Sequence, residues 1–174
     1  KMSMSKGQPK NTIAKVAAAA EYLPQAIRAK VLSKTFGTVV PMVGTAGVSY
    51  DLVTADKVIC SIKNRRPMQN HIKGVHAVAI ALIAETATGF VVGMNTPNDS
   101  MVLIKSLKME YKKLAKGDLV AVATLTPTQR ELISSTPKGE TTVQCIITDS
   151  TGQSPVECEM IWAWVPKKRP AKTA

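Results

Sequence analysis

The pattern of apolar and polar positions divides the chain into a helical first part and a set of strands around a second helix. Residues 11–36 carry apolar side chains at helical spacing, in two pieces separated by Pro24. Asn11 or Thr12 can cap the first piece, and Gly37 can end the second. We therefore expect an N-terminal helical segment over residues 11–36.

The following residues alternate between apolar and polar in the way that half-buried strands do. The first two predicted strands, residues 48–52 and 58–62, are joined by the turn-like Thr54-Ala55-Asp56 and form a hairpin. Four further strands are predicted near residues 101–112, 117–126, 141–149 and 156–165. In the last of them one face carries Val156, Cys158, Met160, Trp162 and Trp164.

Residues 75–91 have a different pattern, because they are rich in alanine and apolar on every side. Their only ionisable side chains are His76 and Glu85. A helix that is hydrophobic all round is a buried helix. Within an antiparallel set of strands, such a helix is covered only if the sheet wraps around it. The sequence therefore predicts an α+β fold, an antiparallel sheet wrapped around one long central helix at about 75–91.

The length of 174 residues fits one domain with a substantial core, and neither a linker nor an internal repeat divides it. We expect a single domain over residues 11–166, with a flexible tail over residues 1–10 and a basic tail over residues 167–174. Lys and Arg number 23 against 12 Asp and Glu, for a net charge of +11. This excess favours anionic partners such as phosphates.

The cysteines and the apolar runs indicate the cellular compartment in which the protein is expected. No apolar run approaches the roughly eighteen residues of a membrane span, so none is expected. Cys60, Cys145 and Cys158 lack the spacing of metal ligands and fall on apolar faces of predicted strands. They are expected to be buried free thiols in a reducing compartment, which favours a cytoplasmic protein without a metal site.

The residues around the start of the central helix carry the candidate chemistry. Asn70, Gly74 and His76 lie just before it, where unpaired backbone N–H groups suit a developing oxyanion. Glu85 lies in its middle, where desolvation would raise the pKa of a carboxyl group, as a general base or nucleophile requires. Structural interpretations compete: His76 as a structural histidine, Asn70 as a turn residue or cap, and Glu85 as part of a structural network.

The spacing of these residues resembles a known motif. Asn70, His76 and Glu85 follow N-x5-H-x8-[DE], entering a small-residue helix, as in the hotdog-fold thioesterase superfamily. The likeness is to its phenylacetate-type acyl-CoA thioesterases and to a largely uncharacterised bacterial branch. The segment MEYKKLAKGD, residues 109–118, resembles the one that joins two hotdog strands, and the likeness covers roughly residues 48–165. The resemblance implies a hotdog fold that works as a homodimer or a dimer of dimers.

The resemblance also implies a site shared by two chains, in which the helix acid of one faces the loop of the other. The Ala77 backbone N–H would polarise the thioester carbonyl, and Asn70 would position the thioester or a water. His76 would support the loop or contact the substrate, and Glu85 would activate water or attack directly. The acyl chain would run along the dimer interface beside Ala81 and Ala84. Further substrate-binding candidates are Gly74, Val78 and Thr88, and basic residues that fit the phosphates of coenzyme A are Arg65, Arg66, Lys73, Lys105 and Lys108.

The expected function is hydrolysis of acyl-CoA or acyl-carrier-protein thioesters, with no cofactor beyond the coenzyme A of the substrate. A non-catalytic acyl-thioester or lipid binding module is the alternative, because Val78 stands where the family commonly has glycine and Ile104 where it often has a polar residue. A dehydratase or hydratase ranks lower, since no G-H-F-P tetrapeptide occurs. Nucleic acid is not expected as a partner, because aromatics are 4% of residues and no basic–aromatic strand motif is present.

Overall fold

The computed structural model describes residues 11–167, so the two predicted tails lie outside the described residues apart from Lys167. Its α-helices are α1 (Thr12–Ala20), α2 (Gln25–Val39), α3 (Pro41–Ala46), α4 (Ala77–Asn95) and α5 (Pro127–Ser135), with a short 3-10 helix η1 (Arg66–Met68). Its strands are β1 (Ser49–Val53), β2 (Lys57–Ile62), β3 (Ser100–Tyr111), β4 (Leu119–Thr124), β5 (Gly139–Asp149) and β6 (Val156–Pro166).

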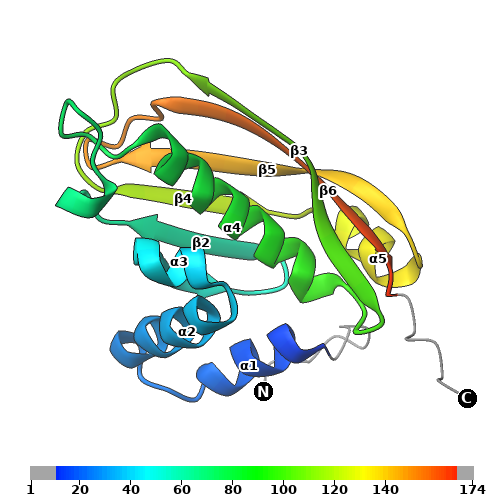
Figure 1. Ribbon diagram of the computed structural model, residues 1–174. Coiled ribbons are helices and arrows are strands. Elements are labelled where there is room, and N and C mark those ends of the chain that lie inside the picture. The colour runs from blue at the N-terminus through cyan, green and yellow to red at the C-terminus, as the bar shows by residue number, and fades with distance from the viewer. Residues whose placement is uncertain (1–10, 168–174) are drawn as a thin grey trace, which may run out of the picture.

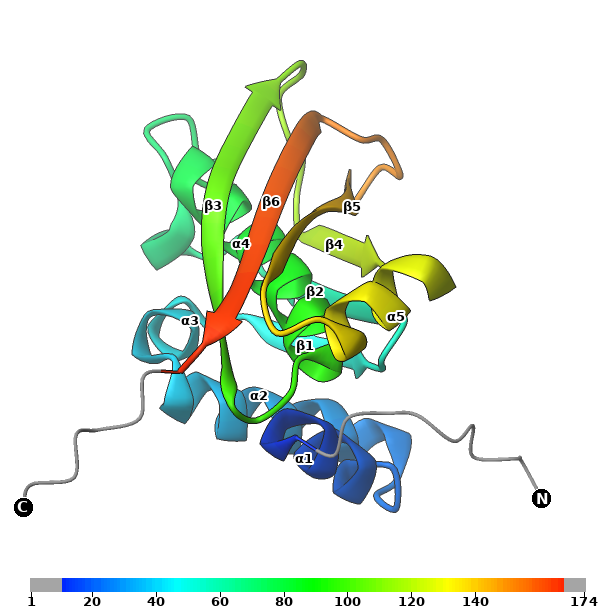
Figure 2. The ribbon, with the colours of Figure 1, turned by 90° about the vertical axis from the view of Figure 1, so that its right-hand side faces the viewer.

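The six described strands form one antiparallel sheet in the order β1-β2-β4-β5-β6-β3. Strand β5 changes partner along its length, because residues 139–143 pair with β6 and residues 144–149 pair with β4. This change lets β3 and β6 curve away from the other strands, and Figure 2 shows them in front of α4. Strands β1 and β3 are the two edges of the sheet.

Helix α4 lies across the face of this curved sheet (Figure 1), as the central helix of a hotdog fold. It runs from Ala77 to Asn95, so it extends four residues beyond the predicted end. By length and composition alone it could cross a membrane, and within the described residues it is the one helix that could. It is instead largely buried, with Ile83, Ala87 and Val91 fully enclosed against the sheet. The predicted α+β fold with a buried central helix is confirmed.

The N-terminal helices pack beside β1, next to α4 (Figure 1). The Asn11 side chain caps α1 by accepting from the Ala14 N–H at 2.8 Å, as predicted. The prediction that Gly37 ends a helix is wrong, because α2 continues to Val39 and α3 follows. A Cβ on Gly37 would lie 3.0 Å from the Cα of Gly44, so this glycine serves the close packing of α2 on α3.

Three other details differ from the predictions. The register of β1 shifts between Tyr50 and Leu52, so Val53 is buried in place of Leu52, which is half-buried. Helix α5, between β4 and β5, was not predicted. Cys60 is buried as expected, whereas the other two cysteines, Cys145 and Cys158, are half-buried where β5 and β6 diverge.

Candidate functional site

Asn70 organises the turn that precedes α4. Its Oδ1 accepts hydrogen bonds from the N–H groups of Ile72 and Gly74, both at 3.1 Å, and its own N–H donates to the Gly74 carbonyl at 2.9 Å. Lys73 takes a φ of 63° inside this turn, which only a tight turn requires of a non-glycine residue. The amide oxygen of Asn70 is therefore engaged by its own loop.

His76 is the N-cap of α4. Its Nδ1 accepts from the Val78 N–H at 3.2 Å, and its backbone N–H donates to the Met68 carbonyl at 2.7 Å. With Nδ1 as acceptor, the proton of the neutral ring lies on Nε2, which faces away from the helix. The next N–H, that of Ala77, has no intrahelical acceptor at this position, and Ala77 is exposed. The start of α4 thus offers one N–H donor to a molecule outside the chain.

Glu85 is half-buried in the middle of α4, two and a half turns after His76. Burial raises the pKa of its carboxyl group above the ordinary value. No hydrogen bond or ion pair joins this carboxyl to another described residue. A partly desolvated carboxyl without a partner has the properties of an acid–base group, and it also exacts a cost in stability.

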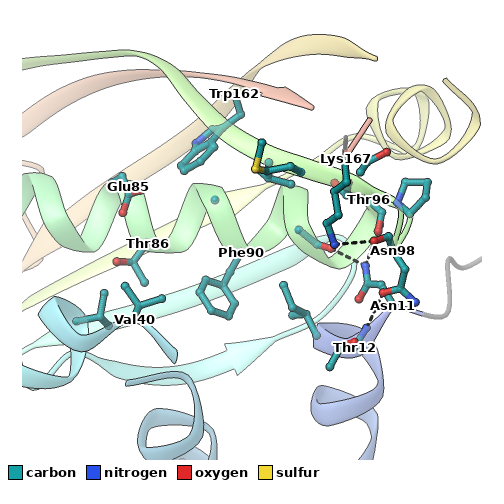
Figure 3. Close-up of a pocket in the computed structure, with 18 residues that line it drawn as sticks. Asn11, Thr12, Val40, Glu85, Thr86, Phe90, Thr96, Asn98, Trp162 and Lys167 are labelled. Atoms are coloured by element: carbon teal, nitrogen blue, oxygen red, sulfur yellow. Dashed lines mark hydrogen bonds between the residues drawn. The ribbon is translucent and has the colours of Figure 1, made fainter. Parts of the chain in front are cut away.

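Glu85 lies at one end of a cavity of about 460 Å³. Figure 3 shows Glu85 and Thr86 at that end, with Phe90 and Trp162 on opposite sides of the middle. The other end is polar, where Lys167 donates to the Asn98 carbonyl at 2.6 Å. The volume falls within the range of about 300–1,000 Å³ for small-molecule sites, and the middle is apolar as such sites are.

The structure does not bring the whole predicted motif together within one chain. Nine residues of helix separate His76 from Glu85, which corresponds to about 13 Å along the axis. His76 and Val78 line a different cavity, of about 430 Å³, between α3, η1 and the first turns of α4. Within a single chain, Glu85 therefore cannot act on a group bound at the Ala77 N–H.

Three of the basic candidates for binding phosphate already have partners within the chain. Arg65 donates to the carbonyls of Thr45 and Ala46 at 3.1 and 2.8 Å, so its guanidinium holds the end of α3. On β3, Lys105 pairs with Glu140, and Lys108 pairs with Glu110 at 3.0 Å. Within residues 11–167, no group of three His, Cys, Asp or Glu side chains could hold a metal ion.

Among the predicted substrate-binding residues, Thr88 is fully buried. Its hydroxyl donates to the Ala84 carbonyl at 2.7 Å and accepts from the indole N–H of Trp162 at 2.8 Å. Sequence reasoning did not select Thr86, Gly89, Phe90 and Gly93, which line the cavity beside Glu85. Their spacing of i, i+3, i+4 and i+7 marks one face of a helix, and this spacing was the available signal.

Comparisons with known proteins agree with this fold. No curated protein sequence matches the chain. A protein of unknown function from Pseudomonas aeruginosa, designated a probable thioesterase, superposes with a TM-score of 0.71 at 17% identity, covering 83% of this chain and 97% of its own. A thioesterase from Haemophilus influenzae has a TM-score of 0.65 at 10% identity, covering 80% and 94%. A thioesterase family protein from Silicibacter pomeroyi has a TM-score of 0.64 at 13% identity, covering 78% and 96%.

These likenesses show that the chain has the hotdog fold of thioesterase-family structures, as the resemblance in the sequence predicted. A family model described as a domain of unknown function, DUF4442, matches residues 28–165. That match spans the end of the helical segment, the central helix and all six strands of the described chain. The chain belongs to the DUF4442 family and has a hotdog fold.

Proposed function

We propose that the protein hydrolyses acyl thioesters of coenzyme A or acyl-carrier protein. The observation that carries the proposal is Glu85, an unpaired, half-buried carboxyl at the end of an apolar cavity. The names of similar structures point to the same reaction, since several are thioesterases. A base beside a cavity that accepts an acyl chain is the arrangement that hydrolysis of an acyl thioester needs.

In the proposed reaction the Glu85 carboxylate removes a proton from water as the water oxygen bonds to the thioester carbon. The carbonyl oxygen becomes an oxyanion and accepts from the Ala77 N–H. The carbon–sulfur bond then breaks, and the thiolate leaves with the proton that Glu85 received. Direct attack by Glu85 is the other possible course, through an anhydride that water then hydrolyses.

This reaction requires a second chain, because one chain keeps Glu85 and the Ala77 N–H apart. Strand β3 supports a homodimer: among the described strands it is an edge of the sheet, and β6 is its one partner there. Four of its large apolar side chains are exposed, and an apolar edge strand of twelve residues needs a cover. These residues are Met101, Leu103, Ile104 and Leu107. A second copy related by a two-fold axis would pair with this edge and bring its own loop to Glu85.

The test is thiol release from acyl-CoAs of different lengths by the wild type and by Glu85→Gln. We expect turnover of at least one acyl-CoA, and a loss of about 100-fold or more in kcat/KM for the variant. Gel filtration and thermal unfolding must show that the variant keeps its assembly and fold. Full turnover by Glu85→Gln would exclude the mechanism, and no turnover by the wild type would exclude the reaction.

Val78 favours a second candidate function, an acyl-thioester binding module without turnover. Its side chain is 57% exposed at the start of α4, where it narrows the approach to the Ala77 N–H. Saturable binding of acyl-CoA by the wild type, unchanged by Glu85→Gln and without thiol release, would identify this function. Val78→Gly distinguishes the two candidate functions further. It widens access to the Ala77 N–H, and this raises kcat only if that N–H binds the oxyanion of the reaction.

A further inference from the structure

Thr86 differs from two nearby threonines, Thr88 in α4 and Thr96 at its C-cap, in the bonding of its hydroxyl. The hydroxyls of Thr88 and Thr96 donate to the carbonyls four residues earlier, at 2.7 and 2.9 Å. The hydroxyl of Thr86 makes no such bond, although the residue is only 3% exposed. Among the described residues, only Thr86 and Tyr50 have a buried side-chain hydroxyl without a partner. A buried hydroxyl left unbonded costs about 1–3 kcal/mol, so it indicates a partner that the chain itself does not supply.

Thr86 lines the cavity that Glu85 closes, next to Glu85 in the chain (Figure 3). Beyond it along α4, two glycines let other side chains approach the helix closely, and a Cβ on Gly89 would lie 2.6 Å from the ring of Trp162. A Cβ on Gly93 would lie 3.1 Å from Cδ1 of Ile13, so this glycine sets the width of the cavity against α1. From Thr86 to Gly93 the helix advances about 10 Å, which gives the apolar part of the cavity a narrow, elongated shape.

Tyr50 adds a second unpaired hydroxyl on the same side of α4. Its ring packs edge-on against Phe90, with 4.7 Å between ring centroids, and Phe90 lines the cavity. Burial, with smaller contributions from Cys60 and Glu85, raises the pKa of this phenol, so it stays neutral and able to donate. Two buried hydroxyls, one lining the cavity beside Glu85 and one on the ring that packs against Phe90, thus lack a hydrogen-bond partner within the described chain.

We propose that this cavity binds the acyl chain of the substrate, and that the Thr86 hydroxyl selects chains with an oxygen on the third carbon, a 3-hydroxyacyl or 3-oxoacyl group. The inference rests on the proposed function for the acyl nature of the ligand. The thioester lies at Glu85, so an oxygen two carbons along the chain is beside Thr86, the adjacent residue. The rest of the chain passes between Phe90 and Trp162, toward Gly93. This path lies inside one protomer. The expectation that Ala84 borders an acyl chain at the dimer interface is wrong, because Ala84 is fully buried within the chain.

Two neutral probes test the proposal without any need for turnover: octanamide and 3-hydroxyoctanamide, titrated by calorimetry. For the wild type we expect 3-hydroxyoctanamide, as one preferred enantiomer, to bind about tenfold more tightly than octanamide. Thr86→Val, which keeps the shape and removes the hydroxyl, should abolish that difference and leave octanamide binding unchanged. Gly93→Ala should weaken both probes by a similar factor, because it narrows the part of the cavity that both chains share.

The opposite results overturn the inference in separate ways. Equal binding of the two probes by the wild type removes the selectivity, and a preference that survives Thr86→Val removes Thr86 as its source. If Gly93→Ala leaves the affinity for both probes unchanged, the cavity is not the site that binds the acyl chain. Since amides are not thioesters, this pattern of binding can hold when thiol release fails, so the two proposals fail independently.

Stability gives a control for the substitution itself. Thr86→Val removes an unbonded hydroxyl, so it should raise the midpoint of urea unfolding or leave it unchanged. Thr88→Val makes the same chemical change two residues later in α4, but it removes the hydrogen bonds of the hydroxyl to Ala84 and Trp162. It should therefore lower the midpoint of urea unfolding. A lower midpoint for both variants would mean that Thr86 is bonded within the protein, and would overturn the inference.

Discussion

At the scale of the residue, Glu85 lies in an environment that stability alone would not select for a carboxyl group. Its pKa is raised by burial, and no described cation or hydrogen-bond donor compensates. A carboxyl group that must lose its proton in such a place destabilises the fold. The same property makes its carboxylate a stronger base toward water. The burial of Glu85 therefore lowers the free energy of unfolding while it makes the carboxylate more basic, and the effect on stability can be measured.

We predict that Glu85→Gln stabilises the protein increasingly as pH rises. Because the folded pKa of Glu85 lies above the unfolded value, the folded chain holds this proton to higher pH than the unfolded chain does. The wild type therefore loses stability as pH rises from the ordinary glutamate pKa through the raised one. The glutamine variant has no such loss. Urea unfolding of both proteins from pH 4 to pH 8, at one protein concentration, measures the difference.

A difference in stability that stays constant over this pH range would contradict the raised pKa. Glu140→Gln is the matched control, because Glu140 is exposed and paired with Lys105. Its effect on stability should be small and should not grow with pH.

The sequence could predict some of these residue properties and not others. A lone carboxylate in an all-apolar helix pointed to Glu85, and its raised pKa follows from burial that the pattern predicted. The free hydroxyl of Thr86 could not be predicted, because Thr88 has the same residue type and the same helix but a bonded hydroxyl. The Thr88 hydroxyl accepts from Trp162, which comes from a strand far along the chain, and no helix pattern shows which threonine will meet that side chain.

At the scale of the element, the sequence predicted the central helix, the strands and the N-terminal helical segment, but neither α3 nor α5. The alternating runs of β4, β5 and β6 were clear, since each of these strands buries one face. Helix α5 was missed, although Thr126 and Gln129 form a capping box with Pro127 in the first turn. The prediction that a helix ends at Gly37 was wrong because glycine has two roles near helices: it ends them, and it lets two helices pack closely. The pattern of one sequence does not distinguish these roles.

We predict that Gly44→Ala destabilises the protein by about 2 kcal/mol, although alanine is the better helix former. A Cβ at this position would lie 2.6 Å from the Gly37 carbonyl oxygen, which is backbone and cannot turn aside. Urea unfolding measures the change. Gly74→Ala is the control, because its nearest contact would be an ordinary 3.6 Å and its effect should be much smaller. A stabilised Gly44→Ala would show that α2 and α3 separate easily.

At the scale of the whole molecule, the division of the site between two cavities is the main result. The motif residues come from one stretch of sequence, yet His76 and Glu85 line different cavities. The sequence motif predicts which residues form the site. The distance between His76 of one chain and Glu85 of another depends on how the sheet edges of two chains pair, and the pattern of a single sequence does not predict that pairing. The exposed apolar face of β3 is the feature that can join the two halves.

We predict that the double substitution Ile104→Lys and Leu107→Lys converts a dimer to a monomer and abolishes thioester hydrolysis. Both side chains are exposed on the edge strand β3, and two lysines there would repel the same positions of a second copy. Analytical ultracentrifugation measures the mass, and thiol release measures the activity. Ile146→Lys is the control: Ile146 is 50% exposed on β5, inside the sheet, so its variant should remain dimeric and active. A monomeric double variant with full activity would show that one chain suffices and that the Ala77 N–H of the partner takes no part.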